Sequence, residues 1–155
     1  MNQWIQFANC EINRAAQSII YPIFGWAPFC KEKWDKESVS IKNYLKIIEN
    51  NLSKSQYIVG DKMTLADIAL FRHLSFFMML NINEGMRKSL LKKTTQWFEK
   101  IMNTPEAKKA YGRMILCKNA IKPFAGEIKR PILTLPKKKE EKVKVEDKKV
   151  EEKKN

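Results

Sequence analysis

Histidine, cysteine and glycine are scarce in these 155 residues, and each shortage limits the chemistry available to the chain. The single histidine, His73, lies among apolar neighbours and cannot by itself supply a histidine-bearing metal cluster or a nucleophile–base pair. The five glycines are isolated, so the sequence has no glycine-rich loop that would hold a phosphate. We therefore expect no catalytic, cofactor-binding or metal-binding residues, and we interpret the protein as one that is not an enzyme.

The cysteines and the hydrophobic runs point to the cellular compartment. Cys10, Cys30 and Cys117 form an odd set without C-x-x-C spacing, which predicts reduced thiols in a cytosolic protein and no zinc site. The apolar runs on either side of Arg72 and His73 are shorter than the roughly 20 residues that span a bilayer. The N-terminus is not typical of a secretory signal. We expect a cytoplasmic protein that makes no membrane contact.

Acidic residues are outnumbered, and the excess of positive charge is unevenly divided. Residues 137–155 hold nine lysines and six acidic residues, so about +10 of the net +13 falls on residues 1–136. The same C-terminal stretch has no aromatic residue and only three valines, too little apolar area to offset the cost of ordering a chain. We predict a folded domain over residues 1–125 and a disordered lysine/glutamate-rich linker or tail over residues 126–155.

The apolar residues that are present recur at helical spacing. This periodicity predicts one helix from Asn2 to about Ile20, ended or kinked by Pro22 and Gly25, and a second from about Asp35 to Leu52. Thr104 followed by Pro105 is typical of a helix start. No stretch shows the alternation of a strand, so we predict an all-α domain.

The clearest local signal is "VGDKMTLADIALF", residues 59–71. Thr64 and Asp67 have the spacing of a capping box, in which the two residues satisfy backbone N–H groups at the start of a helix. The helix that follows, through Leu80, is apolar on all sides, which predicts a buried central helix. Loss of the cap in Asp67→Ala should cost about 0.5–2 kcal/mol of stability.

Two polar groups interrupt this helix, and a basic stretch follows it. We interpret His73 as a satisfied interior or rim residue, and Arg72 as a residue paired with a carboxylate at the rim of the core. Arg87, Lys88, Lys92 and Lys93 have no acidic residue among them, but on a helix they spread over more than half the circumference. We interpret these four residues as a solvated face, and an RNA or acidic-partner contact is their functional alternative.

The capped helix also carries a family resemblance. "VGDKMTLADI" resembles the corresponding segment in the C-terminal helical domain of the glutathione transferase superfamily. "QWIQFANCEINRAAQSIIYPIFG", "NTPEAKKAYG" and "RMILCKNAIKPF" look like the gamma-subunit family of the eukaryotic translation elongation factor 1 complex. The resemblance covers about residues 2–125 and implies a helical bundle around the central helix.

The resemblance also implies a function. It implies a non-catalytic scaffold or anchoring subunit of the guanine nucleotide exchange complex in translation elongation, with the exchange-factor subunits of elongation factor 1 as protein partners. Glutathione activation in the transferases comes from a thioredoxin-like domain that residues 1–155 do not include, so this chain alone should have no conjugating activity.

Three other readings remain open. The first is an accessory domain of an aminoacyl-tRNA synthetase complex, with synthetases as partners, although "FANCEINRAAQSIIYPIFG" fits the elongation factor better. The second is a fragment of a true glutathione transferase, with Trp26, Phe29 and Trp34 lining a substrate pocket. The third is weak, direct RNA binding, which rests on charge alone.

Overall fold

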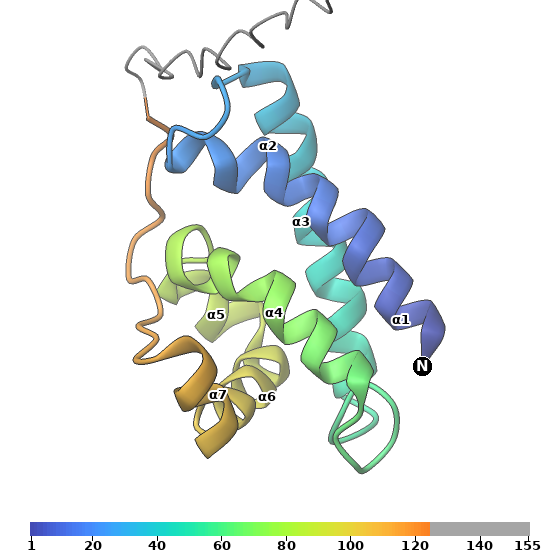
Figure 1. The fold of residues 1–155 in the computed structure, drawn as a ribbon. Coiled ribbons are helices and arrows are strands. Elements are labelled where there is room, and N and C mark those ends of the chain that lie inside the picture. The colour runs from blue at the N-terminus through green and yellow to red at the C-terminus, as the bar shows by residue number, and fades with distance from the viewer. Residues whose placement is uncertain (125–155) are drawn as a thin grey trace, which may run out of the picture.

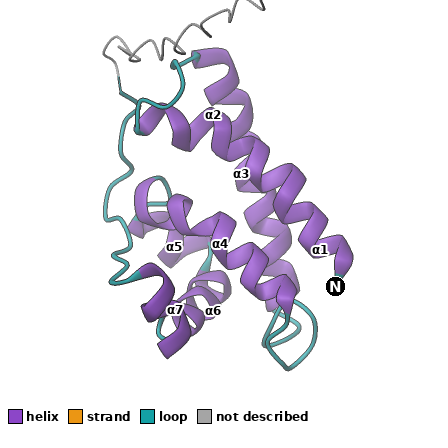
Figure 2. Cartoon of the chain, in the orientation of Figure 1, coloured by secondary structure: helices purple, strands orange, loops and turns teal. Residues whose placement is uncertain are grey.

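The computed structural model describes residues 1–124 as an all-α domain, as the sequence predicts (Figure 2). Its only β feature in that range is one isolated bridge between Tyr57 and Gly60. The predicted linker, residues 126–155, lies outside the described residues. The elements are α1 (Asn2–Phe7), the π-helical segment η1 (Ala8–Ile12), α2 (Asn13–Ile23), α3 (Lys31–Leu52), α4 (Leu65–Leu80), α5 (Glu84–Leu90), α6 (Lys92–Met102) and α7 (Pro105–Tyr111).

The first three elements form one continuous rod along one side of the molecule (Figure 1). The rod buries a single stripe whose spacing follows the helical period, namely Ala8, Ile12, Ala15 and Ile19. Pro22 lies inside α2 and is buried, and the helix ends at Ile23, one residue beyond it. Gly25, with φ of +69°, then turns the chain away, so the predicted boundary is correct to within a few residues.

Helix α3 begins at Lys31, about four residues earlier than its predicted start. Cys30, at its N-cap position, is extended and offers no side-chain hydrogen bond to the helix. The start therefore lacks the capping residue by which a helix is recognised in a sequence, and this explains the error. The long helix packs against α2 near its beginning and against α6 near its end.

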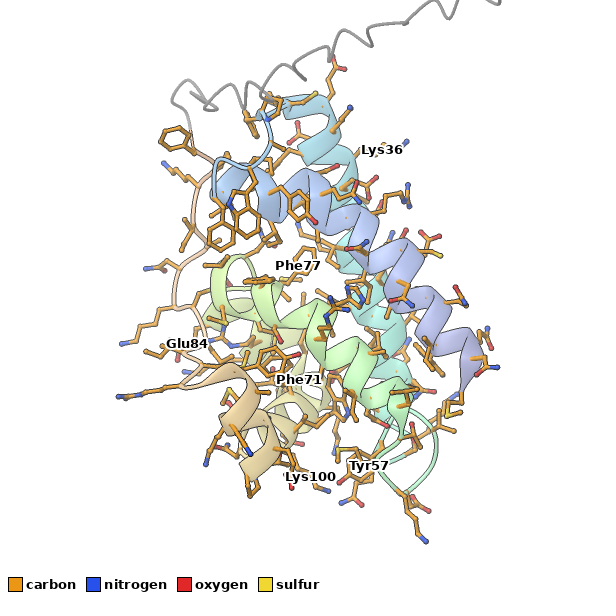
Figure 3. The ribbon with its side chains drawn as sticks, viewed as in Figure 1. Lys36, Tyr57, Phe71, Phe77, Glu84 and Lys100 are labelled. Atoms are coloured by element: carbon orange, nitrogen blue, oxygen red, sulfur yellow. The ribbon has the colours of Figure 1, made fainter. Side chains whose placement is uncertain are left out.

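Helix α4 occupies the middle of the bundle and packs against α1, η1 and α2 (Figure 1). Phe71 and Phe77 project from it into the core and are almost fully buried (Figure 3). The ring of Phe71 lies 4.6 Å from that of Phe98, and this contact joins α4 to α6. The central position of the capped helix is therefore as the sequence predicts.

Beyond α7, residues 112–124 run back along the bundle toward the end of α2 (Figure 1). The backbone of this C-terminal segment is held by hydrogen bonds from Cys117 N–H to Met78 O (3.1 Å), Ile121 N–H to Leu80 O (2.7 Å) and Phe124 N–H to Pro22 O (2.9 Å). The segment therefore ties the end of α4 to the end of α2.

Candidate functional site

Asp67 is the most heavily bonded side chain at the start of α4. Its Oδ2 accepts the backbone N–H (2.8 Å) and the hydroxyl (2.9 Å) of Thr64, so the predicted pair forms a capping box. Its Oδ1 accepts the backbone N–H of Ile58 and the indole N–H of Trp97, both at 2.9 Å. Asp67 is fully buried. One carboxylate therefore fixes the start of α4, the loop before it and helix α6.

A second carboxylate joins α3 to α6. Glu49 accepts the backbone N–H groups of Lys93 (2.9 Å) and Thr94 (2.8 Å), and also the Thr94 hydroxyl (2.7 Å). These are among the first N–H groups of α6, whose own N-cap residue, Leu91, supplies no side-chain bond. Glu49 therefore caps a helix 44 residues further along the chain.

We expect Glu49→Ala to destabilise the protein by about 1–2 kcal/mol, because two backbone donors of α6 lose their acceptor. Urea denaturation followed by circular dichroism measures the effect. Glu99→Ala is the matched control, since Glu99 is exposed on α6 and its side chain forms no ion pair within residues 1–124. Equal midpoints for the two variants would show that the cap contributes nothing.

One face of α4 lies on the surface, so the predicted burial of this central helix does not extend to every side. Leu65 and Ile68 are 58% and 49% exposed, and Phe76 is 45% exposed. Together with Arg72 they form the α4 face, a stripe with helical spacing. The sequence could not reveal this face, because apolar residues on every side of a helix do not indicate which side the other elements of the same chain cover.

Arg72 lies within the α4 face, and its predicted role is also corrected. It is exposed, and no ion pair joins it to a carboxylate within residues 1–124. The face therefore combines exposed apolar side chains with one guanidinium that has no acidic partner in the described chain. This combination is suited to a protein surface that presents apolar groups around a carboxylate.

A groove of about 500 Å³ lies beside the α4 face, between α2, α4 and α7. Trp26 and Phe76 contribute to its walls, and Phe24 stacks on Trp26 with ring centroids 4.5 Å apart. Phe29 and Trp34 pack against each other instead, at 5.6 Å, and do not line this groove. The three aromatic residues predicted to line one pocket are therefore divided between two places.

His73 lies at the edge of this groove, half-buried, with Nε2 2.9 Å from Asn9 Oδ1. This placement agrees with the prediction of a satisfied rim residue. Burial, and to a smaller extent the positive charge of Arg72, lowers the pKa of His73. Among the described residues no three His, Cys, Asp or Glu side chains gather as they would around a metal ion.

The lowered pKa of His73 predicts a pH dependence of stability. As the pH falls below about 6.5, the unfolded chain binds the proton before the folded protein does. The stability that the neutral His73 side chain contributes is therefore complete above that pH, and it is lost as the pH falls through the pKa of His73 in the folded protein. We expect the Tm to drop more between about pH 7 and pH 5 in the wild type than in His73→Gln, as differential scanning calorimetry would show. Superimposable pH profiles would contradict this assignment.

The four predicted basic contact residues do not all share one surface, because Arg87, Lys88 and Lys92 line one groove beside α5 and α6, whereas Lys93 lines another. Arg87 is buried, and its guanidinium donates to Ile82 O (2.5 Å) and Cys117 O (2.7 Å). Its assignment to a partner or RNA contact is wrong, because the side chain is used to hold backbone carbonyls. Lys88 is exposed and paired with Glu84 at 2.6 Å, whereas Lys92 and Lys93 are exposed at the start of α6.

The fold defines a class of protein, and comparison with known families agrees with it. Residues 13–105 match the family model for the glutathione S-transferase C-terminal domain. The chain therefore belongs to the glutathione S-transferase C-terminal domain family. Among the described residues no helix is long and apolar enough to cross a membrane.

Two similar proteins each align with about three quarters of this chain. Elongation factor 1-gamma of Artemia salina is 31% identical over 118 residues, which cover 76% of this chain and 27% of that protein. Valine--tRNA ligase of Takifugu rubripes is 28% identical over 121 residues, covering 77% of this chain and 10% of that protein. The chain thus spans about a quarter of the elongation factor and a tenth of the ligase.

A solved structure shows the same fold. The GST-like domain of elongation factor 1-gamma from Saccharomyces cerevisiae superimposes with a TM-score of 0.72 at 21% identity, covering 78% of this chain and 55% of that one. Glutathione S-transferase III superimposes with a TM-score of 0.59, also at 21% identity, covering 74% of this chain and 54% of that one. Both likenesses concern the helical fold alone.

Proposed function

We propose that this chain is a non-catalytic scaffold domain of the translation elongation factor 1 complex, acting in the cytoplasm through contacts with the exchange-factor subunits. The observation that carries the proposal is the α4 face, because an exposed apolar stripe on a central helix is suited to burial against another protein surface. The similarity to elongation factor 1-gamma supports the choice of complex.

The rest of the domain suits docking better than catalysis. Two carboxylates, Asp67 and Glu49, bind the starts of α4 and α6, so the helix that carries the docking face is anchored to the rest of the domain. The one histidine is engaged with Asn9. The side chains that line the groove are mainly aromatic and apolar, which favours packing over proton transfer.

A second candidate is an accessory domain of an aminoacyl-tRNA synthetase complex. The similarity to valine--tRNA ligase over 77% of this chain favours it. The same α4 face would then meet a synthetase, so the two candidates differ in the partner and share the docking surface.

Affinity capture with matched variants tests both candidates. The tagged full chain is incubated with cytosolic extract at physiological salt, and the retained elongation factor 1 exchange subunits and synthetases are quantified by mass spectrometry. Ile68→Asp places a charge in the α4 face, and Ile47→Asp makes the same change on α3 at a residue of similar exposure, 50% against 49%. Circular dichroism checks that both variants fold.

We expect the wild type and Ile47→Asp to retain the exchange subunits and Ile68→Asp to lose at least about tenfold, because a charge buried in an apolar contact is costly. Retention of synthetases with the same pattern would favour the second candidate. Equal retention of partners by Ile68→Asp and Ile47→Asp would overturn the role of the α4 face. If the wild type retained neither the exchange subunits nor the synthetases, both proposed functions would be overturned.

A further inference from the structure

A second concave surface lies away from the α4 face and has different chemistry. This groove, of about 450 Å³, runs between α6 and the loop that joins α3 to α4. Three lysines line it, Lys54 from the loop and Lys93 and Lys100 from α6, and we call it the lysine groove. Lys54 is distant in the sequence from the other two, and the packing of α3 against α6 brings them together.

The charge of the lysine groove is not neutralised by the described part of the chain. None of its three lysines forms an ion pair with a carboxylate in residues 1–124. Asp61 is the only acidic residue among those lining it. Lys100 lies over the ring of Tyr57, 4.4 Å from its centroid, an interaction that leaves its charge in place (Figure 3). The groove therefore carries a local excess of positive charge.

The walls of the groove are joined by hydrogen bonds between elements. Glu49 binds the backbone N–H of Lys93 and so fixes the start of α6. Asp67 binds Trp97 on α6 and Ile58 in the loop, and so links the two sides of the groove. The lysines are therefore placed on a preorganised frame, and a ligand need order only their side chains.

The residues that line the groove favour a phosphate backbone over a protein surface as the ligand. Apart from the lysines and Asp61, the groove is lined by Ser53, Ser55, Gln56, Gln96, Leu52 and Trp97. The last two are buried, so no exposed apolar side chain is present to anchor a protein. Amide groups and ammonium groups are sufficient for phosphate oxygens, which need spaced cations and hydrogen-bond donors.

We propose that the lysine groove binds the sugar-phosphate backbone of RNA, without sequence preference. Lys54, Lys93 and Lys100 contact phosphates, and Gln56 and Gln96 donate hydrogen bonds to phosphate or sugar oxygens. This surface replaces the predicted contact set, of which only Lys93 is retained. The proposal is independent of the scaffold function, because the α4 face and the lysine groove share no residue.

Fluorescence anisotropy with a labelled single-stranded RNA of mixed sequence tests the proposal on the full chain. The test variant is Lys93→Glu/Lys100→Glu. Its control, Lys42→Glu/Lys46→Glu, makes the same change in net charge at two exposed lysines of α3 outside the groove. Both variants keep the lysine-rich residues 137–155, so any binding by that stretch is common to them. Thermal melting checks that both remain folded.

We expect the groove variant to bind RNA at least about tenfold more weakly than the control variant at physiological salt. We also expect the slope of log affinity against log salt to become shallower by about 0.7 for each phosphate that a lysine no longer neutralises. Equal weakening in the two variants would overturn the groove as the site and assign binding to overall charge. Equal displacement of the RNA by polyglutamate at matched charge concentration would overturn RNA as the ligand class in favour of an acidic protein.

Discussion

Replacement of Asp67 by alanine should destabilise the protein by about 3–5 kcal/mol, well above the loss of one helix cap. The capping hydrogen bonds to Thr64 account for about 0.5–2 kcal/mol of that loss. The rest arises because the Ile58 N–H and the Trp97 indole N–H are left without an acceptor. A buried donor without a partner costs about 1–3 kcal/mol. Urea denaturation of the full chain, followed by circular dichroism, measures the change in free energy of unfolding.

Two further variants divide this effect into its parts. Thr64→Ala removes the hydroxyl that bonds to Asp67 and should cost about 1 kcal/mol. Trp97→Phe removes the indole donor while keeping an aromatic ring, and should cost an intermediate amount. If Asp67→Ala cost no more than Thr64→Ala, the bonds from Oδ1 to the loop and to α6 would contribute nothing, and the assignment would be wrong.

Replacement of Arg87 by alanine should destabilise the protein by about 2–4 kcal/mol. The buried guanidinium makes two charge-assisted hydrogen bonds, to the carbonyls of Ile82 and Cys117, and each is stronger than a neutral bond. One carbonyl belongs to the turn after α4 and the other to the C-terminal segment, residues 112–124. The variant should therefore release this segment as well as lower the global stability.

Limited trypsin digestion separates the local effect from the global one. Cleavage at Arg113 and Lys118 should become faster in Arg87→Ala under conditions in which the rest of the domain is still folded. Lys88→Ala is the control, because it removes an exposed i,i+4 ion pair with Glu84 that is worth about 0.3–0.5 kcal/mol. Identical digestion patterns for the two variants would contradict a role for Arg87 in holding the segment.

Local signals made part of this fold predictable. The capping box at Thr64 and Asp67 lies within four residues, and the helix start at Thr104 and Pro105 is equally compact, with the Thr104 hydroxyl accepting the Ala107 N–H. Hydrophobic periodicity indicated the long helices for the same reason. In each case the information lies in neighbouring residues, so a sequence read alone contains it.

The parts that could not be predicted depend on contacts between distant residues. Asp67 meets Trp97 across 30 positions, and Glu49 meets Thr94 across 45. Arg87 lies in a basic stretch that is typical of a surface, but its two acceptors come from the turn after α4 and from residue 117. No local pattern marks such a residue as buried, because its environment is made by other parts of the chain.

The candidate docking surface could not be predicted from the sequence either, because it too depends on contacts between distant residues. The apolar character of α4 was evident, but only the packing of α1, η1 and α2 against it shows which side remains on the surface. Leu65, Ile68 and Phe76 on that side give the proposed scaffold function a definite location. The lysine groove likewise depends on the approach of α6 to the loop before α4.

Hydroxyl-radical footprinting of the full chain, with and without the purified exchange-factor subunits of elongation factor 1, tests the scaffold proposal most directly. We predict that Leu65, Ile68 and Phe76 become protected in the mixture. Two comparably exposed apolar side chains on α3, Val39 and Ile47, should react at an unchanged rate. Protection of Val39 and Ile47 in place of the α4 face, or no protection at any of these residues, would contradict the account.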